Sequence, residues 1–398
     1  MVGFLDRSIY VERHQRIRQF LEREGYEALL VLTPDNFYYL TGFFLDVAPW
    51  ERPVVACIPR QGEPFMVMNE LSTNHLRMAA ARGSLAVDEY HIWHEHVSSA
   101  IRNYTKPQWT ELVAAVLRSR GIDRGKLACD AGFGQLQPLT GSLPKVQLVS
   151  EPSLLVNMRT VKSEPELELV RQGAKLTDFG QAAWRDLIRP GRLMAEVDAE
   201  TVRQMVSRGA EMFPGCKVEC RVSSLSGPAS ASPHGTGGDA DMRIACGHGI
   251  VNIIIVRLNG YVIENERTWI VGEPSDLQAR AFRAAEAACL AATRQMVAGN
   301  QVSSIDAAAQ QVIEAAGFGA HINHRTGHGI GIAGHEFPED VAFNHRLLQA
   351  GEVWSAEPGI YIYGLGGFRH DDTVIVGQDA PEVVTTWSKR LAEQTIPV

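Results

Sequence analysis

The sequence predicts two domains of different fold class, an α/β domain over residues 1–155 and an α+β domain over residues 156–398. A chain of 398 residues is longer than a single hydrophobic core usually organises. Helical and strand patterns alternate in its first part, which favours a layered α/β domain with a mostly parallel sheet. Long helical patterns, a strand-rich stretch and further helices follow, and this order is typical of an α+β domain.

The elements of the first domain follow from hydrophobic spacing and turn residues. Apolar residues at helical spacing predict a helix over 11–25 that stops at Gly25. A continuous apolar run predicts a buried strand over 28–32, ended by the turn residues 33–36. Similar patterns predict the other elements, a helix over 109–120 and strands over 53–58, 63–68, 126–129 and 146–149.

A domain boundary is expected over 150–163, just before a strong helix start. Ser163 as N-cap and Glu166 three positions later form a capping box, with Pro165 inside the first turn. In the second domain, helices are predicted over 164–188, 195–209, 275–297 and 302–316, with a strand-rich stretch over 217–272.

Composition excludes several classes of partner. A net charge of −8 argues against nucleic acid, because phosphate binding needs a concentrated basic surface. No run of apolar residues is long enough for a signal peptide or a membrane-spanning helix. Six cysteines in a chain of this length form neither a disulfide scaffold nor a paired metal motif. We therefore expect a cytoplasmic protein with no membrane partner that acts on a small-molecule substrate.

Histidines and carboxylates gather in five segments of the second domain. They are His234 in the loop 232–238, Glu264 and Glu266 two apart in a strand, His328 among glycines, Glu357 before Pro358-Gly359, and Asp371 with Asp372 before an apolar run. Residues two apart in a strand share one face. Buried carboxylates are costly unless they are paired, hydrogen-bonded or metal-bound, so we expect these segments to form one shared hydrolytic site.

The segments that carry these residues resemble the superfamily of creatinase, prolidase, aminopeptidase P and methionine aminopeptidase. Tyr26–Val31 and Asn36–Phe43 are similar to the N-terminal domain of its creatinase and prolidase branch, and Lys162–Arg171 is similar to the helix between the two domains. The resemblance covers essentially the whole chain. It implies a C-terminal pita-bread domain of α+β class, preceded by the smaller α/β creatinase N-terminal domain.

The resemblance also implies a metal centre that this chain does not fully reproduce. The metallopeptidases hold two divalent ions through two Asp, one His and two Glu. By alignment with their motifs, His328, Glu357, Asp371 and Glu264 take four of these positions, but the first Asp falls on Ile253. We expect a site without metal. The alternative is a single divalent ion such as Mn²⁺, held by Glu264, His328, Glu357 and Asp371.

Within this superfamily the site pattern is most similar to that of creatinase, which has also lost its metal ligands and hydrolyses a C–N bond. The resemblance implies that His234 is the general base, with Glu266 and Glu357 as anchors for a cationic nitrogen and His328 as a further catalytic residue. Substrate binding is expected from His335, Arg369 and Asp371, with Arg369 paired either with a substrate carboxylate or with Asp371. The main prediction is a hydrolase of a C–N bond in a small polar nitrogen-containing metabolite.

Alternatives remain open. The chain could be an Xaa-Pro aminopeptidase or dipeptidase with a degenerate metal site, a non-catalytic pita-bread binding protein, or an enzyme that eliminates rather than hydrolyses. A homodimer is expected from the resemblance, with the aromatic stretch 37–44 exposed for the interface. His91, His94 and His96 are expected to have surface or packing roles, and His321 and His324 to lie either behind the site or at a helix end.

Overall fold

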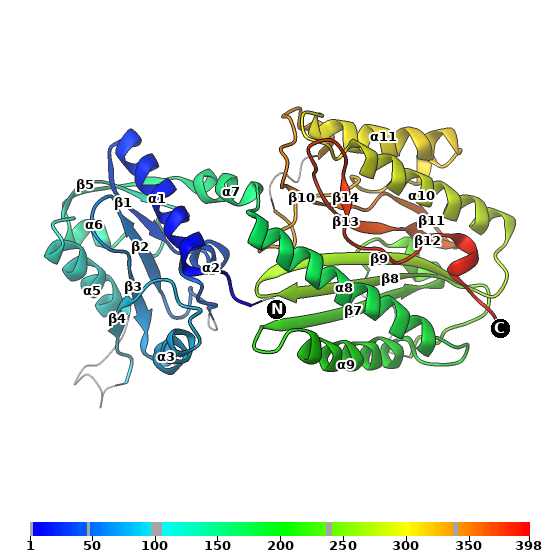
Figure 1. The fold of residues 1–398 in the computed structure, drawn as a ribbon, viewed down its shortest axis with the longest axis horizontal. Helices are drawn as coiled ribbons and strands as arrows, with labels where there is room; N and C mark the ends of the chain where they lie inside the picture. Colours follow the sequence, from blue (N-terminus) through cyan, green and yellow to red (C-terminus); the bar gives the residue numbers. More distant parts are fainter. Residues whose placement is uncertain (1–2, 46–47, 97–105, 236–240, 337–340) are drawn as a thin grey trace. The chain divides into compact units, whose positions relative to one another are not determined.

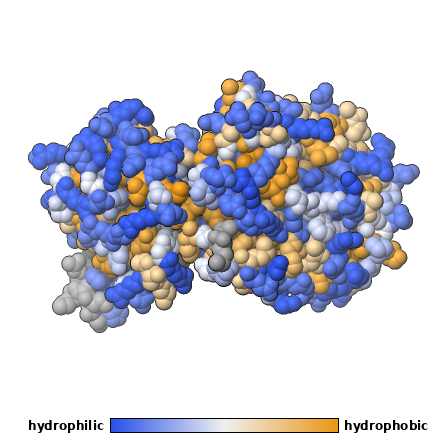
Figure 2. All heavy atoms as spheres, in the orientation of Figure 1, coloured by the Kyte–Doolittle hydropathy of each residue, from blue (hydrophilic) through white to orange (hydrophobic). Residues whose placement is uncertain are grey.

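The computed structural model describes residues 3–45, 48–96, 106–235, 241–336 and 341–398. It divides into two compact units, one of residues Phe4–Met158 and one of Arg159–Val398 together with Met1–Gly3. The sequence-based boundary lies between residues 155 and 156. No described helix combines the length and the apolar character needed to cross a membrane. Hydrophilic side chains are spread over the visible face of both units, with apolar patches among them (Figure 2).

The first unit is an α/β layer built on one sheet. Its elements are α1 (Arg7–Glu24), β1 (Tyr26–Val31), α2 (Pro34–Thr41), β2 (Val55–Pro59), β3 (Phe65–Asn69), α3 (Thr73–Ala81), β4 (Glu89–Trp93), α5 (Lys106–Ser119), β5 (Arg124–Cys129), α6 (Leu139–Ser142), β6 (Lys145–Ser150) and α7 (Pro152–Thr160), which continues past the boundary. The described strands are ordered β4-β3-β2-β1-β5-β6 (Figure 1). The sheet is mixed, because β2 runs antiparallel to both β1 and β3 while the other neighbours are parallel.

Two local expectations for this unit are corrected. The turn residues after β1 begin the helix α2, with Pro34 in its first turn, where a missing backbone N–H costs nothing. The aromatic stretch 37–44 is not exposed: Phe37, Tyr38, Tyr39 and Phe43 are all buried. It therefore gives no support to the expected homodimer.

The second unit carries the long helices and a second sheet. Its elements are α8 (Glu164–Leu187), α9 (Met194–Met212), β7 (Val218–Ser226), β8 (Gly249–Leu258), β9 (Tyr261–Val271), α10 (Asp276–Gln295), α11 (Val302–Ala315), β10 (Val353–Ala356), β11 (Gly359–Ile362), β12 (Gly366–Arg369), β13 (Asp371–Ile375), β14 (Glu382–Val383) and β15 (Thr395–Ile396). The predicted capping box starts α8, because the Glu166 carboxylate accepts hydrogen bonds from the backbone N–H and the hydroxyl of Ser163.

Helices cover one face of this sheet and leave the other face for the site. The described strands run in the order β10-β13-β9-β8-β7, with β14 beside β13 and β15 beside β9. Helix α8 crosses β8 and β9, and α9 packs on β7 (Figure 1). Helices α10 and α11 pack on each other, and their apolar side chains form a core with strands β10, β12 and β13. Gly173 lets α8 approach the sheet closely, since a Cβ there would stand 2.3 Å from Ile263 Cδ1.

Candidate active site

The floor of the site is formed by strands β7, β8 and β9. Asn259 and Gly260 connect β8 to β9 with φ of 44° and 88°, values that suit the two-residue turn of a tight hairpin. This turn fixes the register, so Ile253 lies opposite Glu266 and Ile255 lies opposite Glu264. Alternation along each strand then places these four side chains on the same face of the sheet.

The opposite face of the same strands belongs to the helices. The Asn265 side chain donates to Asp178 Oδ1 on α8 at 2.9 Å, and Asn252 donates to Ser224 Oγ at 3.1 Å. Asn252 is fully buried and lies outside the pocket lining, whereas Ile253 lines the pocket. A register slip that would bring Asn252 into the site is therefore excluded.

A pocket of about 560 Å³ opens over this floor. All but one of the eight predicted site residues line it: His234, Glu264, Glu266, His328, His335, Glu357 and Arg369. The eighth, Asp371, lies beneath it on β13, where oxygens of Glu266, Glu357 and Asp371 all lie within 4.8 Å of one another. His234 is exposed on the stretch after Pro233. The predicted loop continues through Thr236, Gly237 and Gly238, which lie outside the described residues.

His328 is held by backbone contacts with β10. Its N–H donates to Ser355 Oγ at 3.0 Å, and a Cβ at Gly327 would stand 2.1 Å from the Ser355 carbonyl oxygen, so only glycine permits this approach. Nδ1 lies 3.1 Å from the Gly329 carbonyl, which can only accept, so Nδ1 carries the hydrogen. Nε2 therefore presents its lone pair toward the pocket.

That lone pair faces two carboxyl groups. His328 Nε2 lies 3.5 Å from Glu264 Oε2 and 3.4 Å from Glu357 Oε1. Three acceptors can face one another only if a proton sits on one of them or a cation lies between them. Burial together with the neighbouring His335 lowers the pKa of His328 to about 3, so the proton belongs on a carboxyl. His335 stacks on the His328 ring with centroids 3.7 Å apart.

The carboxyl groups themselves favour protonation or a bound cation. Burial, opposed in part by the charge of Arg369, raises the pKa of Glu357 to about 8. Burial and the charges of Glu357 and Glu266 raise the pKa of Glu264 well above its usual value. The pKa of Asp371 is raised in the same way, by burial first and then by the surrounding carboxylates. Asp371 Oδ1 accepts the Ala356 N–H, while its buried Oδ2 has no hydrogen-bond partner among the described residues.

Arg369 neutralises one of these carboxylates. Its Nε and Nη2 both contact the Glu266 carboxylate, the latter at 3.0 Å, which makes a two-pronged ion pair. The expected alternative pairing of Arg369 with Asp371 is therefore corrected. Behind it, Arg369 Nη1 donates to Tyr361 Oη at 3.3 Å, and Tyr361 Oη lies 2.7 Å from His324 Nε2. His324 thus lies behind the site, one contact removed from Arg369.

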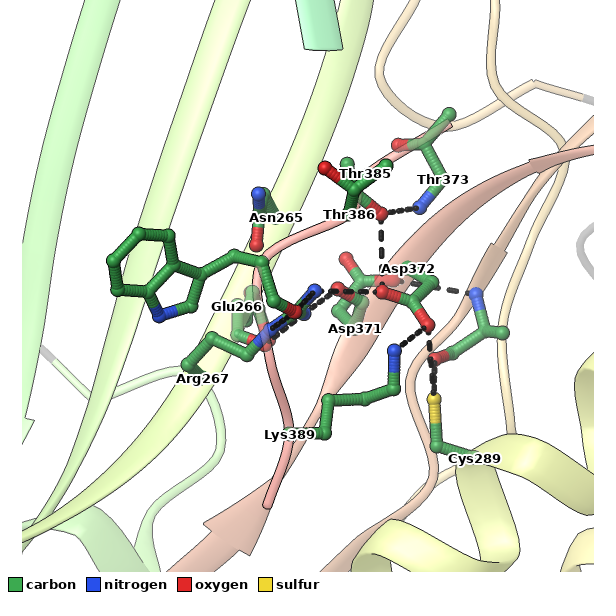
Figure 3. Close-up of polar contacts among 12 residues, drawn as sticks. Asn265, Glu266, Arg267, Cys289, Asp371, Asp372, Thr373, Thr385, Thr386 and Lys389 are labelled. Atoms are coloured by element: carbon green, nitrogen blue, oxygen red, sulfur yellow. Dashed lines mark hydrogen bonds and ion pairs between the residues drawn. The ribbon is translucent and has the colours of Figure 1, made fainter. Parts of the chain in front are cut away.

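A second layer fixes the strands that carry these residues. Thr373 Oγ1 accepts the Glu264 N–H at 3.0 Å and donates to the Glu264 carbonyl at 2.8 Å, which joins β9 to β13. The Arg267 guanidinium donates to the Asp371 carbonyl at 2.7 Å and to Asp372 Oδ1 at 2.8 Å. Lys389 and Thr385, from the C-terminal segment, contact the same Asp372 carboxylate (Figure 3).

Other predicted histidines lie apart from the site. His91 and His94 belong to the first unit, where they lie 2.9 Å from Glu89 and 3.1 Å from Glu70. Sequence reasoning missed a set of lining residues on β7 and β8, Glu219, Arg221, Ile255 and Arg257. It predicted only a strand-rich stretch over 217–272 and assigned no role to these residues, although the alternation of residues 219, 221 and 223 was the signal that could have placed them on the pocket face.

Comparison with known proteins places the chain in a family. It belongs to metallopeptidase family M24, whose model matches residues 168–378, and the model of the creatinase/prolidase N-terminal domain matches residues 13–161. The putative dipeptidase YkvY of Bacillus subtilis is 30% identical over 96% of this chain and 99% of its own length. The structure of dipeptidase PepE from Mycobacterium ulcerans superposes with a TM-score of 0.81 at 29% identity, covering 100% of both chains. The prolidase of Pyrococcus horikoshii shares the fold, with a TM-score of 0.79 at 24% identity over 96% of this chain and 99% of its own.

These findings confirm the predicted superfamily, fold and enzyme class, so the chain is a hydrolase with a pita-bread domain. They do not support the finer resemblance to creatinase. The relatives named above are dipeptidases and a prolidase, which favours the peptidase alternative over the creatinase-like main prediction.

The two-ion centre of the family does not fit this site. The first aspartate position is Ile253, whose aliphatic side chain lines the pocket and offers no ligand atom. Among the described residues, the group compact enough for one cation is Glu266, Glu357 and Asp371, whereas His328 Nε2 lies within 3.5 Å of an oxygen of Glu264 and of Glu357. The single ion of the alternative prediction, at Glu264, His328, Glu357 and Asp371, would supply Lewis acidity.

Proposed function

We propose that this chain hydrolyses a C–N bond in a small substrate with a cationic nitrogen, using its own side chains in place of the family's two-ion centre. The observation that carries the proposal is Ile253 at the first ligand position, beside three raised-pKa carboxyls that favour a positive charge. Because Arg369 already satisfies both oxygens of Glu266, the cation anchors are Glu264 and Glu357.

The reaction needs one group that moves a proton. His234 is exposed at the pocket wall, and its imidazole carries a ring nitrogen that can accept a proton and return it, as a general base must. It takes a proton from water as the water oxygen attacks the carbon of the scissile bond. The same proton then passes to the leaving nitrogen as the C–N bond breaks. Glu266 is paired with Arg369, so it adds no unpaired charge to the pocket wall.

A second candidate is a dipeptidase that uses one divalent ion. The names of the relatives favour it, as does the close approach of His328 Nε2 to Glu264 and Glu357. In this case the same four side chains hold the ion, while His234 and Arg369 still line the substrate pocket.

The two candidates differ in their response to chelation. The purified protein is assayed on creatine, a cyclic amidine and the dipeptide Ala-Pro, before and after dialysis against a chelator. The leading candidate predicts turnover that survives chelation and falls about 10²–10⁴-fold in His234→Ala, the usual contribution of a general base. Activity that disappears on chelation and returns with Mn²⁺ would establish the second candidate. Equal turnover by wild type and His234→Ala would remove His234 from the mechanism.

A further inference from the structure

Arg221 is a cation at the pocket that the proposed reaction does not use. It lies on β7, the edge strand of the sheet, and its exposed side chain lines the pocket. Within the described parts of the chain, no ion pair or hydrogen bond engages its guanidinium. A pocket-facing guanidinium with five N–H donors and no protein acceptor is suited to bind an anion from solution.

The neighbouring charges on the same edge are already engaged. Glu219 Oε1 lies 2.9 Å from Lys217 Nζ, and its other oxygen lies 3.8 Å from Arg257 Nε. Arg257 also donates to the Ile332 carbonyl at 2.8 Å. Arg221 is thus set apart from the other charged residues that β7 and β8 contribute to the pocket.

Strand register places Arg221 in line with the catalytic carboxyls. Arg221 lies opposite Ile255 on β8, and Ile255 lies opposite Glu264 on β9. The row beside it runs from Ser223 through Ile253 to Glu266. The pocket floor therefore has a positive edge, an aliphatic middle and a negative inner end.

The width of the floor sets the length of a suitable ligand. Two strand spacings separate the backbones of Arg221 and Glu264 by about 10 Å. An extended dipeptide spans at most about 7 Å, and a charge-assisted hydrogen bond of about 2.8 Å at each end brings the total to about 13 Å as an upper limit. This upper limit exceeds the separation of the two backbones, and the flexible side chain of Arg221 on its edge strand can adjust to the difference between the two lengths.

We propose that Arg221 binds the free carboxylate of a zwitterionic substrate of dipeptide length. The cationic nitrogen of that substrate lies at Glu264 and Glu357, and its apolar part rests on Ile253 and Ile255. This inference rests on the proposed function only in taking this pocket as the substrate site. It makes Arg221 a specificity residue that distinguishes a free acid from its neutral derivative.

The test compares Ala-Pro with its C-terminal amide, which has the same scissile bond but no carboxylate. We expect wild type to prefer the free acid by about 10–100-fold in kcat/KM, mainly through KM, the effect of hydrogen bonds to a charged group. Arg221→Gln should abolish the preference and Arg221→Lys should keep part of it. Arg203→Gln, an equal change of charge on an exposed residue of α9 that is paired with Glu200, should leave the preference unchanged.

Calorimetric binding of both probes separates this inference from the proposed function. If wild type binds the free acid more tightly and Arg221→Gln does not, while neither protein cleaves it, Arg221 stands as the anchor and the proposed reaction fails. If wild type cleaves acid and amide equally well, the reaction stands and the Arg221 anchor is overturned. A preference that survives in Arg221→Gln, or no binding of either probe, also overturns it.

Discussion

Asp371 and Asp372 are adjacent carboxylates on β13 with opposite surroundings. Asp372 is paired with buried Arg267, contacts Lys389 and accepts from Thr385, and these partners outweigh burial and lower its pKa. Asp371 lies among Glu264, Glu266 and Glu357, and burial with these like charges raises its pKa. Successive residues of a strand point to opposite faces, so one backbone step separates a structural ion cluster from a reactive one.

The difference shows where this fold is optimised for stability and where it is not. Around Asp372 every charge has a close opposite charge, and Figure 3 shows Arg267 and Lys389 converging on its carboxylate. Around Asp371 several carboxyls share one region with only Arg369 as a direct cationic partner among the described residues. Uncompensated buried charge of this kind is costly, and active sites are where such arrangements are commonly found.

The largest expected effect comes from making the same isosteric change on both neighbours. Asp372→Asn leaves the guanidinium of Arg267, fully buried, without its carboxylate, and should lower the free energy of unfolding by about 3–5 kcal/mol. Asp371→Asn keeps the acceptor for the Ala356 N–H and removes a repelled carboxyl, so stability should stay the same or rise. Urea denaturation of the two variants checks this. An equal loss of unfolding free energy in both variants would contradict the distinction between the ion cluster around Asp372 and the carboxyl cluster around Asp371.

The second effect is a dependence of stability on pH in chelator-containing buffer. The folded pKa of Glu357, about 8, lies above its unfolded value of 4.5, so its contribution is fully present below 4.5 and is lost as pH rises through 8. His328 acts in the opposite sense, but only between about 3 and its unfolded value of 6.5. From pH 6.5 to 8 the free energy of unfolding should therefore fall by roughly 2 kcal/mol, at about 1.4 kcal/mol per pH unit.

Glu357→Gln is the matched control for that measurement, because it keeps the size of the side chain and removes its titration. Its stability should change less between pH 6.5 and 8 than that of wild type. A wild-type protein whose stability does not fall over this interval would mean that Glu357 is ionised in the folded state, as it would be beside a bound cation.

A smaller effect is expected at the edge of the structural cluster. Lys389→Met removes one of two cations from Asp372 but leaves Arg267 in place, and the lysine side chain is 14% exposed. We expect a loss of about 1–2 kcal/mol, near that of a hydrogen bond to a charged group. Thermal unfolding measures it, with the exposed Arg203→Gln as a control that should be close to neutral. A loss as large as that of Asp372→Asn would show that Lys389, rather than Arg267, balances the cluster.

Much of this architecture could be predicted from local patterns. The four long helices α8 to α11 begin and end within three residues of the predicted ranges, because their apolar spacing and their capping residues agree. Helix α2 could not be predicted, since Pro34 and Asp35 serve equally well in a turn and in the first turn of a helix. The gathering of His328, Glu357 and Glu264 was predicted from the motifs that carry them.

Pairing between distant side chains was less accessible to sequence reasoning. Arg369 ends β12 and Asp371 begins β13, yet Arg369 pairs with Glu266 on the neighbouring strand β9. This pairing depends on the register of β9 and β13, in which Glu266 lies opposite Asp371. Arg221 was missed because its strand has weak apolar alternation and ends in small residues. Neither the Arg369–Glu266 ion pair nor the position of Arg221 in the pocket leaves a local sequence pattern from which it could be predicted.

The central physical claim is that an isoleucine has taken the place of an ion-binding carboxylate. Ile253→Asp restores a carboxylate at that position, and elemental analysis after equilibration with Mn²⁺ counts the ions bound by each protein. The account predicts that Ile253→Asp binds at least one more ion per chain than wild type. Two tightly bound ions in wild type would contradict it.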